Sequence, residues 1–121
     1  MSYLLENKVS LITGSTRGLG LGIAECLAAG GSKIALNYHG NREVAEQARE
    51  KLLAMGAHVM LIRADVTDKS QVSSMVEAVE EKWGAVDILV PNATGPQPQK
   101  PIEEYDADFY REMYEFFVLS P

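Results

Sequence analysis

Residues 9–20 read VSLITGSTRGLG, an apolar run followed directly by a glycine-rich segment. The apolar run predicts a short buried strand at 8–13, and the glycines predict a tight turn from that strand into a helix. Gly14 permits the turn. Gly18 and Gly20 have no side chain to block the approach of the backbone to a ligand or a neighbouring strand. A helix that starts here points its N–H groups and positive dipole end at bound phosphates. The residues predicted to surround a pyrophosphate are Gly14, Ser15, Thr16, Arg17, Gly18, Leu19 and Gly20.

The composition fits one ordinary globular domain. The chain has 121 residues, of which 46% are hydrophobic and 23% are charged, so residues 1–121 are expected to form a single domain. A net charge of −6 argues against nucleic acid or an anionic membrane as a partner. The first seven residues lack the pattern of a signal peptide, and no apolar run reaches membrane-spanning length. The single cysteine, Cys26, is expected to be a buried thiol, and we expect a cytoplasmic protein.

Predicted strands and helices alternate along the whole chain. Further strands are expected at 33–38, 58–63 and 86–90, and helices at 42–55, from 68 or 69 to 83, and at 103–119. The first helix is expected to bury Leu19, Ile23, Cys26 and Leu27 along one stripe. Such alternation predicts an α/β fold with a parallel sheet, for which we expect the strand order 3-2-1-4. Ligands bind such sheets where the strand order reverses, so the glycine loop and the Asn92-Ala93 segment should face each other across one crevice.

Three motifs in this order resemble the short-chain dehydrogenase/reductase family. The spacing Thr-Gly-x-x-x-Gly-x-Gly from Thr13 to Gly20 is similar to the cofactor loop of that family. Asp65-Val66 resembles the pair that holds the adenine amino group, and residues 87–95, DILVPNATG, resemble the fourth strand and its Asn-Asn-Ala-Gly turn. The resemblance covers only the N-terminal half of the family's fold. It implies a Rossmann-type, doubly wound sheet, truncated before the catalytic half.

The segment after the second strand favours NADP(H) over NAD. Residues 37–42, NYHGNR, contain no acid that would hold a ribose 2′-hydroxyl. Arg17 and Arg42 could instead bind the 2′-phosphate of NADP, although two solvated arginines are the alternative. The stretch that contains Tyr38 also resembles NADP-dependent 3-oxoacyl-carrier-protein reductases. Outside the glycine loop, the predicted cofactor residues are Tyr38, Arg42, Asp65, Val66, Asn92 and Ala93.

The residues that the family uses for proton transfer are not found in this sequence. The resemblance implies a Tyr-x-x-x-Lys pair and a Ser, but none of the five tyrosines has a lysine four residues on. The motifs also depart from the family: Pro91 replaces an Asn, Thr94 replaces a Gly, and Phe116 stands where the last helix usually carries an Asn. We therefore predict no catalytic residue and no metal ligand in the chain itself. Activity is expected only together with a missing half.

The last predicted helix carries two aromatic stripes, one of which we expect to make an oligomer contact. Packing within the domain accounts for the first stripe, which is Tyr105, Phe109, Met113 and Phe116. The stripe expected to make the oligomer contact is the second, Tyr110, Tyr114 and Phe117. Burial of this helix by a missing C-terminal half is an equal alternative. Without a fifth strand, the strand at 86–90 should be an exposed, adhesive edge.

Three functions fit these observations. The chain is predicted to be the cofactor-binding half of an oxidoreductase that transfers hydride between NADP(H) and a small carbonyl or alcohol substrate. The alternatives are a non-catalytic dinucleotide-binding module and a degenerate protein that uses the fold for interaction. Each motif also has a structural explanation: the glycine loop as a plain turn, Asp65 as a helix cap, and Asn92 as a turn residue.

Overall fold

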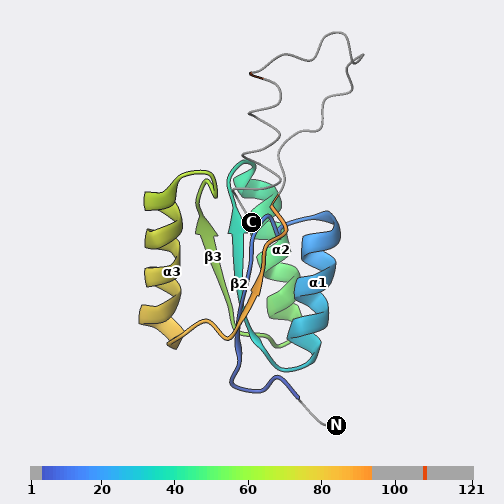
Figure 1. The fold of residues 1–121 in the computed structure, drawn as a ribbon. Coiled ribbons are helices and arrows are strands. Elements are labelled where there is room, and N and C mark those ends of the chain that lie inside the picture. The colour runs from blue at the N-terminus through green and yellow to red at the C-terminus, as the bar shows by residue number, and fades with distance from the viewer. Residues whose placement is uncertain (1–3, 94–107, 109–121) are drawn as a thin grey trace.

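The computed structural model describes residues 4–93 and 108. Strands and helices alternate along this part of the chain (Figure 1). They are β1 (Val9–Ile12), α1 (Gly18–Ala29), β2 (Lys33–Tyr38), α2 (Arg42–Ala54), β3 (Val59–Arg63), α3 (Lys69–Trp83) and β4 (Ile88–Val90). The helix predicted at 103–119, with its two aromatic stripes and Phe116, lies outside the described residues except for Asp108, as does Thr94.

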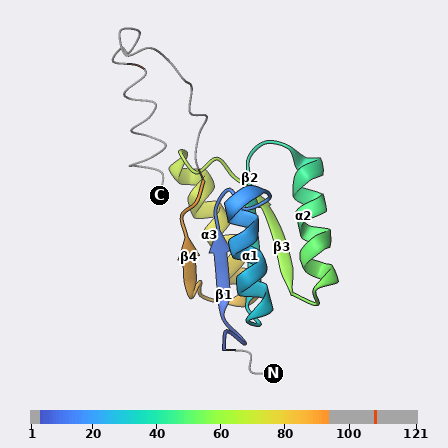
Figure 2. The ribbon, with the colours of Figure 1, turned by 90° about the vertical axis from the view of Figure 1, so that its right-hand side faces the viewer.

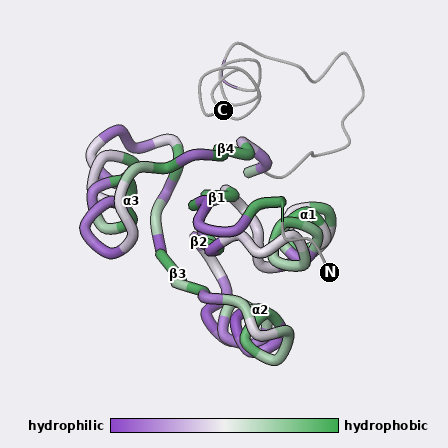
Figure 3. The backbone as a smooth tube through the Cα atoms, turned by 90° about the horizontal axis from the view of Figure 1, so that it is seen from below, coloured by the Kyte–Doolittle hydropathy of each residue, from purple (hydrophilic) through white to green (hydrophobic). Residues whose placement is uncertain are grey.

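The four strands form one sheet in the order β3-β2-β1-β4, and all of its pairings are parallel. This confirms the predicted doubly wound, Rossmann-type topology. Helices α1 and α2 cover one face of the sheet and α3 covers the other, as Figure 2 and Figure 3 show from two directions. The carboxyl ends of the strands therefore meet at one edge of the sheet, beside the start of α1.

Each face of the sheet has its own apolar core. Alternate residues of a strand point to opposite faces, so Leu11 and Ala35 pack toward Met75 and Val79 of α3. On the other face, a second cluster joins the sheet to α1 and α2. It consists of Ile12, Ala24, Ile34, Leu36, Ala48 and Leu52.

Helix α1 packs through small residues, which corrects two sequence predictions. Its fully buried residues are Gly20 and Ala24, so the helix lies close to the sheet. Leu19, predicted to lie in the packed stripe, is 74% exposed. Cys26 is also exposed, so the expected buried thiol is wrong. The helical spacing located the helix correctly, and Leu27 does pack against the core, but Leu19 and Cys26 do not belong to the packed side.

Helices α2 and α3 begin at the polar residues that precede them. The side chain of Asn41 accepts a hydrogen bond from the Val44 N–H, and the side chain of Asp68 accepts from the N–H groups of Ser70 and Gln71. These caps bind N–H groups that have no partner inside the helix. No helix in the described part of the chain is long and apolar enough to cross a membrane.

Candidate functional site

A cleft of about 520 Å³ opens at the carboxyl ends of the strands. This is the place that the sheet topology predicts for a ligand. Segments that follow all four strands contribute to the cleft, so the crevice predicted between the glycine loop and the Asn92-Ala93 segment is present. Its lining residues are Gly14, Thr16, Arg17, Leu19, Asn37, Tyr38, His39, Gly40, Asn41, Val44, Ala64, Asp65, Val66, Asn92 and Ala93.

The three glycines of the loop have different roles. Gly14 has φ +57°, and a Cβ added to it would lie 2.8 Å from the Cα of Ala93. A Cβ on Gly20 would lie 2.5 Å from Asn92 Nδ2. Gly18 has φ +60°, but an added Cβ would have no described atom within 4 Å. Gly14 and Gly20 therefore allow the loop to pack against the turn after β4, whereas Gly18 leaves open space at the start of α1.

Thr13 and Asn92 join the glycine loop to the turn after β4. The Thr13 hydroxyl oxygen accepts hydrogen bonds from the backbone N–H groups of Asn92 at 2.9 Å and Ala93 at 3.0 Å. The Asn92 side-chain amide donates to the Gly14 carbonyl oxygen at 3.1 Å. Pro91 has no N–H to donate, but the two donors in this contact come from the residues after it. The hydrogen bonds between the turn and the loop are therefore present although this chain has Pro91 where the family has an asparagine.

Asn37, at the end of β2, lies beneath the loop and is only 2% exposed. Its side-chain oxygen accepts from the Gly14 N–H at 3.1 Å, and its backbone N–H donates to the Ser15 hydroxyl at 3.0 Å. Ser15 is therefore a buried support of the loop and does not line the cleft. Asn37 was not predicted as a site residue. Asn at the end of a strand is typical of a turn, so its residue type gave no signal of burial.

Asp65 lines the cleft at the end of β3. Its Oδ1 accepts hydrogen bonds from the Thr67 hydroxyl at 2.6 Å and the Thr67 N–H at 2.9 Å. These two bonds hold the pKa of Asp65 below its usual value, so the group is an anion at neutral pH. The residue that caps α3 is Asp68. The alternative that Asp65 is only a helix cap is therefore wrong.

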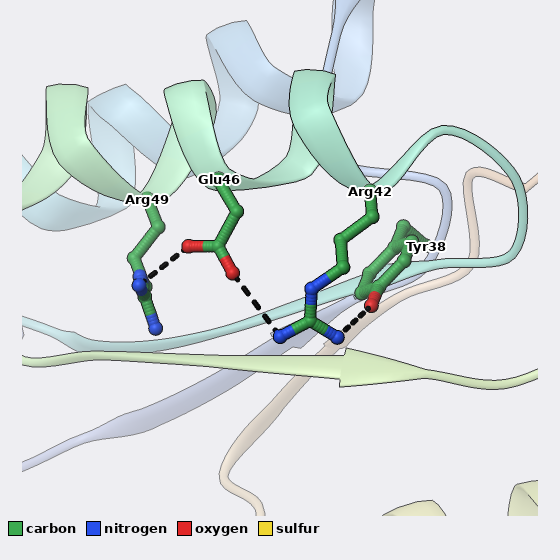
Figure 4. A network of polar contacts seen from close by, with 4 residues as sticks. All are labelled: Tyr38, Arg42, Glu46 and Arg49. Carbon is green, nitrogen blue, oxygen red and sulfur yellow. Dashed lines mark hydrogen bonds and ion pairs between the residues drawn. The ribbon is translucent and has the colours of Figure 1, made fainter.

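The two arginines predicted to meet a phosphate occupy different positions. Arg17 is exposed and lines the cleft. Arg42 begins α2 and lies outside the lining residues; its guanidinium donates to the Tyr38 hydroxyl at 3.3 Å and pairs with Glu46 at 3.3 Å (Figure 4). Glu46 also pairs with Arg49. Of the two arginines, the structure brings only Arg17 to the cleft.

The other predicted cofactor residues also fall into those that line the cleft and those that do not. Thr16, Leu19, Tyr38, Val66 and Ala93 line the cleft, whereas Gly18 and Gly20 adjoin it without lining it. Among the described residues, no group of three or more His, Cys, Asp or Glu side chains could hold a metal ion. The cleft offers backbone N–H groups and the Arg17 guanidinium as donors and the Asp65 carboxylate as an acceptor, a set suited to an organic phosphate ligand that also carries donor groups.

A family model defines the class of protein to which this fold and cleft belong. The model of the short chain dehydrogenases matches residues 8–121, which is nearly the whole chain. The chain therefore belongs to the short-chain dehydrogenase family, a family of oxidoreductases, as the three motifs predicted.

Individual relatives agree with this assignment. Galactitol 2-dehydrogenase of Agrobacterium fabrum is 36% identical over 117 residues, which cover 97% of this chain and 44% of that protein. The 3-oxoacyl-acyl-carrier-protein reductase of Staphylococcus aureus is 41% identical over 86 residues, 71% of this chain and 35% of that protein. A crystal structure of a short chain dehydrogenase from Burkholderia cenocepacia in complex with NADP has a TM-score of 0.87 and 32% identity, and the match covers 97% of this chain and 47% of that one. The chain thus spans less than half the length of these relatives.

Proposed function

We propose that the cleft binds NADP(H) and that this chain supplies the cofactor-binding half of a reaction that transfers hydride to or from a small carbonyl or alcohol substrate. The observation that carries the proposal is the open space at Gly18, where a loop residue with φ +60° meets the first turn of α1. The first N–H groups of a helix have no partner inside it. A pyrophosphate placed there would accept hydrogen bonds from them without meeting a side chain.

Each end of the cleft suits a different part of the cofactor. Asp65, held as an anion by Thr67, would accept a hydrogen bond from the adenine amino group, and Val66 adjoins it. At the other end, Asn92 lies beside Gly20 of α1 and Ala93 beside Gly14, on the side expected for the nicotinamide. The bound cofactor would supply or accept the hydride. Asp65, Val66, Asn92 and Ala93 would hold and orient the cofactor.

The preference for NADP(H) rests on the charges around the end of β2. The cleft-lining residues from Asn37 to Asn41 include no carboxylate, so nothing there would hold a ribose 2′-hydroxyl or repel a 2′-phosphate. Arg17 can supply a charge-assisted hydrogen bond to that phosphate. Arg42 would first have to exchange its contacts with Tyr38 and Glu46; its side chain is 74% exposed, so the ion pair with Glu46 contributes little stability. The NADP complex of the Burkholderia relative agrees with this preference.

Cofactor preference can be measured by titrating the chain with NADPH and with NADH and recording the fluorescence of the reduced nicotinamide. We expect NADPH to bind at least about tenfold more tightly than NADH, because a charged hydrogen bond to Arg17 distinguishes them. Equal affinities would contradict the NADP preference. Failure of both to bind would contradict the proposed function and would favour a protein that uses the fold for interaction alone.

The pyrophosphate position can be tested with two aspartate variants of α1. Gly18→Asp places a negative charge in the open space at the helix start, and Asp tolerates the positive φ there better than most residues. Gly22→Asp places the same charge one turn along α1, at an exposed glycine whose added Cβ also meets nothing within 4 Å. We expect Gly18→Asp to abolish NADPH binding and Gly22→Asp to retain it. Unchanged affinity in Gly18→Asp would show that the phosphates lie elsewhere.

Several expectations about the whole protein stay predictions. The substrate would be a small carbonyl or alcohol compound, by analogy with relatives named as a reductase and a dehydrogenase. Self-association through the helix at 103–119 and a cytoplasmic location are likewise untested. The proton-transferring Tyr, Lys and Ser of the family are not identified in this sequence, so we assign no catalytic residue to the chain.

A further inference from the structure

One buried side chain connects three segments that build the cleft. The amide of Asn37 accepts from the Gly14 N–H through Oδ1 at 3.1 Å. Through Nδ2 it donates to the carbonyl oxygens of Ile62 at 3.3 Å and Ala64 at 3.2 Å. A side chain at the end of β2 is thus bonded both to the loop after β1 and to the end of β3.

This amide is held in one orientation by its partners. The oxygen faces an N–H group, and the nitrogen faces two carbonyl groups, so a flipped amide would oppose like groups on both sides. Asn37 is 2% exposed, and a buried amide without partners is costly. Both its oxygen and its nitrogen are bonded to backbone groups at the cleft, and these bonds hold the side chain in place.

The two segments that Asn37 joins would hold opposite parts of a dinucleotide. Gly14 begins the loop around the pyrophosphate, and Ala64 immediately precedes Asp65 on the adenine side. A ligand that touches both segments gains affinity when their spacing is fixed before it binds, because less order must be created on binding. A ligand that touches only one segment gains little from that spacing.

We infer that Asn37 is a positioning residue that fixes the distance between the pyrophosphate loop and the adenine side of the cleft, and so sets the affinity for the complete dinucleotide. The inference rests on the proposed function. It adds a residue whose buried amide acts through Gly14 and through the end of β3.

Two variants at this position remove different parts of the contact. Asn37→Ala removes the hydrogen bonds to Gly14, Ile62 and Ala64, together with a long one of 3.5 Å to the carbonyl oxygen of Tyr38. Asn37→Asp has nearly the same shape and keeps an acceptor for the Gly14 N–H, but it places an oxygen against the carbonyl groups of Ile62 and Ala64. If Asn37→Ala does not fold by circular dichroism, Asn37→Asp decides the question.

Ser32→Ala is the matched control for loss of stability alone. Ser32 is also 2% exposed, and its hydroxyl is 2.7 Å from that of Ser10 and donates to the Lys8 carbonyl oxygen at 3.1 Å. This contact lies at the opposite end of the sheet, away from the cleft. Its loss should lower the free energy of unfolding without moving the segments that bind the cofactor.

The test compares the dissociation constants of NADP⁺ and of adenosine, which has no phosphate to reach the glycine loop, for the four proteins by NMR titration. For both Asn37 variants we expect the constant for NADP⁺ to rise by about tenfold or more, and that for adenosine by less than about twofold. Ser32→Ala should change neither. An equal weakening of both ligands, an unchanged affinity for NADP⁺, or an equal loss in Ser32→Ala would overturn the inference. If the wild-type chain does not bind NADP⁺, the proposed function falls as well, so the two failures can be distinguished.

Discussion

At the scale of single residues, the spacing of glycines in α1 shows how closely the helix lies against the glycine loop. A methyl group on Gly20 would lie 2.7 Å from the Gly14 carbonyl oxygen and 2.9 Å from the Ser15 Cα. These are backbone atoms, which cannot rotate away as a flexible side chain can. Gly22, two residues along the same helix, has no described atom within 4 Å of an added Cβ.

We therefore predict opposite effects of alanine at these two positions. Gly20→Ala should lower the free energy of unfolding by about 1–3 kcal/mol, because the loop must move to admit the methyl group. Gly22→Ala should raise it by about 0.5–1 kcal/mol, because alanine loses less backbone entropy in a helix. Urea denaturation of both variants measures these changes. A Gly20→Ala variant as stable as the wild-type chain would contradict the close packing described here.

The residue scale also shows where sequence reasoning was sufficient and where it was not. The glycines of the loop and Asp65 were predicted because their types and spacing carry a specific chemistry. Asn37 was not, because an asparagine looks the same in sequence whether it is exposed in a turn or buried beneath a loop. Its role depends on Gly14 and Ala64, which are distant in sequence and become neighbours only through the strand order.

At the scale of elements, the turn before α3 holds two carboxylates in their charged form. Hydrogen bonds from Thr67 hold the pKa of Asp65 below its usual value of 3.8, and those from Ser70 and Gln71 do the same for Asp68. A carboxyl whose pKa is lower in the folded chain stabilises the fold above its unfolded pKa. That stabilisation is lost as the pH falls through the folded value.

We accordingly predict that the free energy of unfolding decreases as the pH falls below about 4. Asp68→Asn should make this decrease less steep, because asparagine also caps a helix but does not titrate. Urea denaturation at several pH values from neutral to acidic measures the slope for both proteins. An identical slope in the variant would contradict the assignment of part of the acid sensitivity to this cap.

Local sequence signals predicted the bounds of the elements, but they did not always identify which residues of an element are packed. The bounds of β2 were predicted correctly, because the Gly30-Gly31 pair before it and the polar segment 39–41 after it mark both ends. Helix α1 was located correctly, yet Leu19 and Cys26 are exposed. Its buried residues are Gly20 and Ala24, with Leu21, Leu27 and Ala28 partly buried against the same core. Hydrophobic spacing does not single out the two most buried positions, because they hold glycine and alanine.

At the scale of the whole molecule, β4 is an edge strand in the described part of the chain. It pairs with β1 on one side, and Leu89 is 59% exposed. The sequence prediction of an adhesive edge at 86–90 fits this exposure, although the strand itself is shorter and runs from Ile88 to Val90. Exposed apolar edges favour pairing with another chain.

We predict that Leu89→Lys reduces concentration-dependent self-association of this chain, because a charged side chain on an edge opposes pairing. Leu53→Lys is the control, since Leu53 is 45% exposed on α2 and away from the edge. Light scattering over a range of concentrations compares the two variants. An equal reduction in both, or no reduction in Leu89→Lys, would contradict an adhesive β4.

The topology of the molecule could be predicted because the alternation of elements leaves few arrangements of a parallel sheet. The two ends of that sheet nevertheless both carry cavities. Besides the cleft at the carboxyl ends, a cavity of about 290 Å³ lies at the opposite end and is lined by residues that include Ser32, Lys33 and His58. A dinucleotide should bind at the first of these two ends and leave the second unchanged.

The most direct test is an NMR titration of the uniformly ¹⁵N-labelled chain with NADP⁺, following each backbone amide. We predict saturable shifts at Gly14, Arg17 and Asp65, and none at Ser32 and His58. Shifts confined to the opposite cavity, or no saturable shift at any amide, would contradict the account.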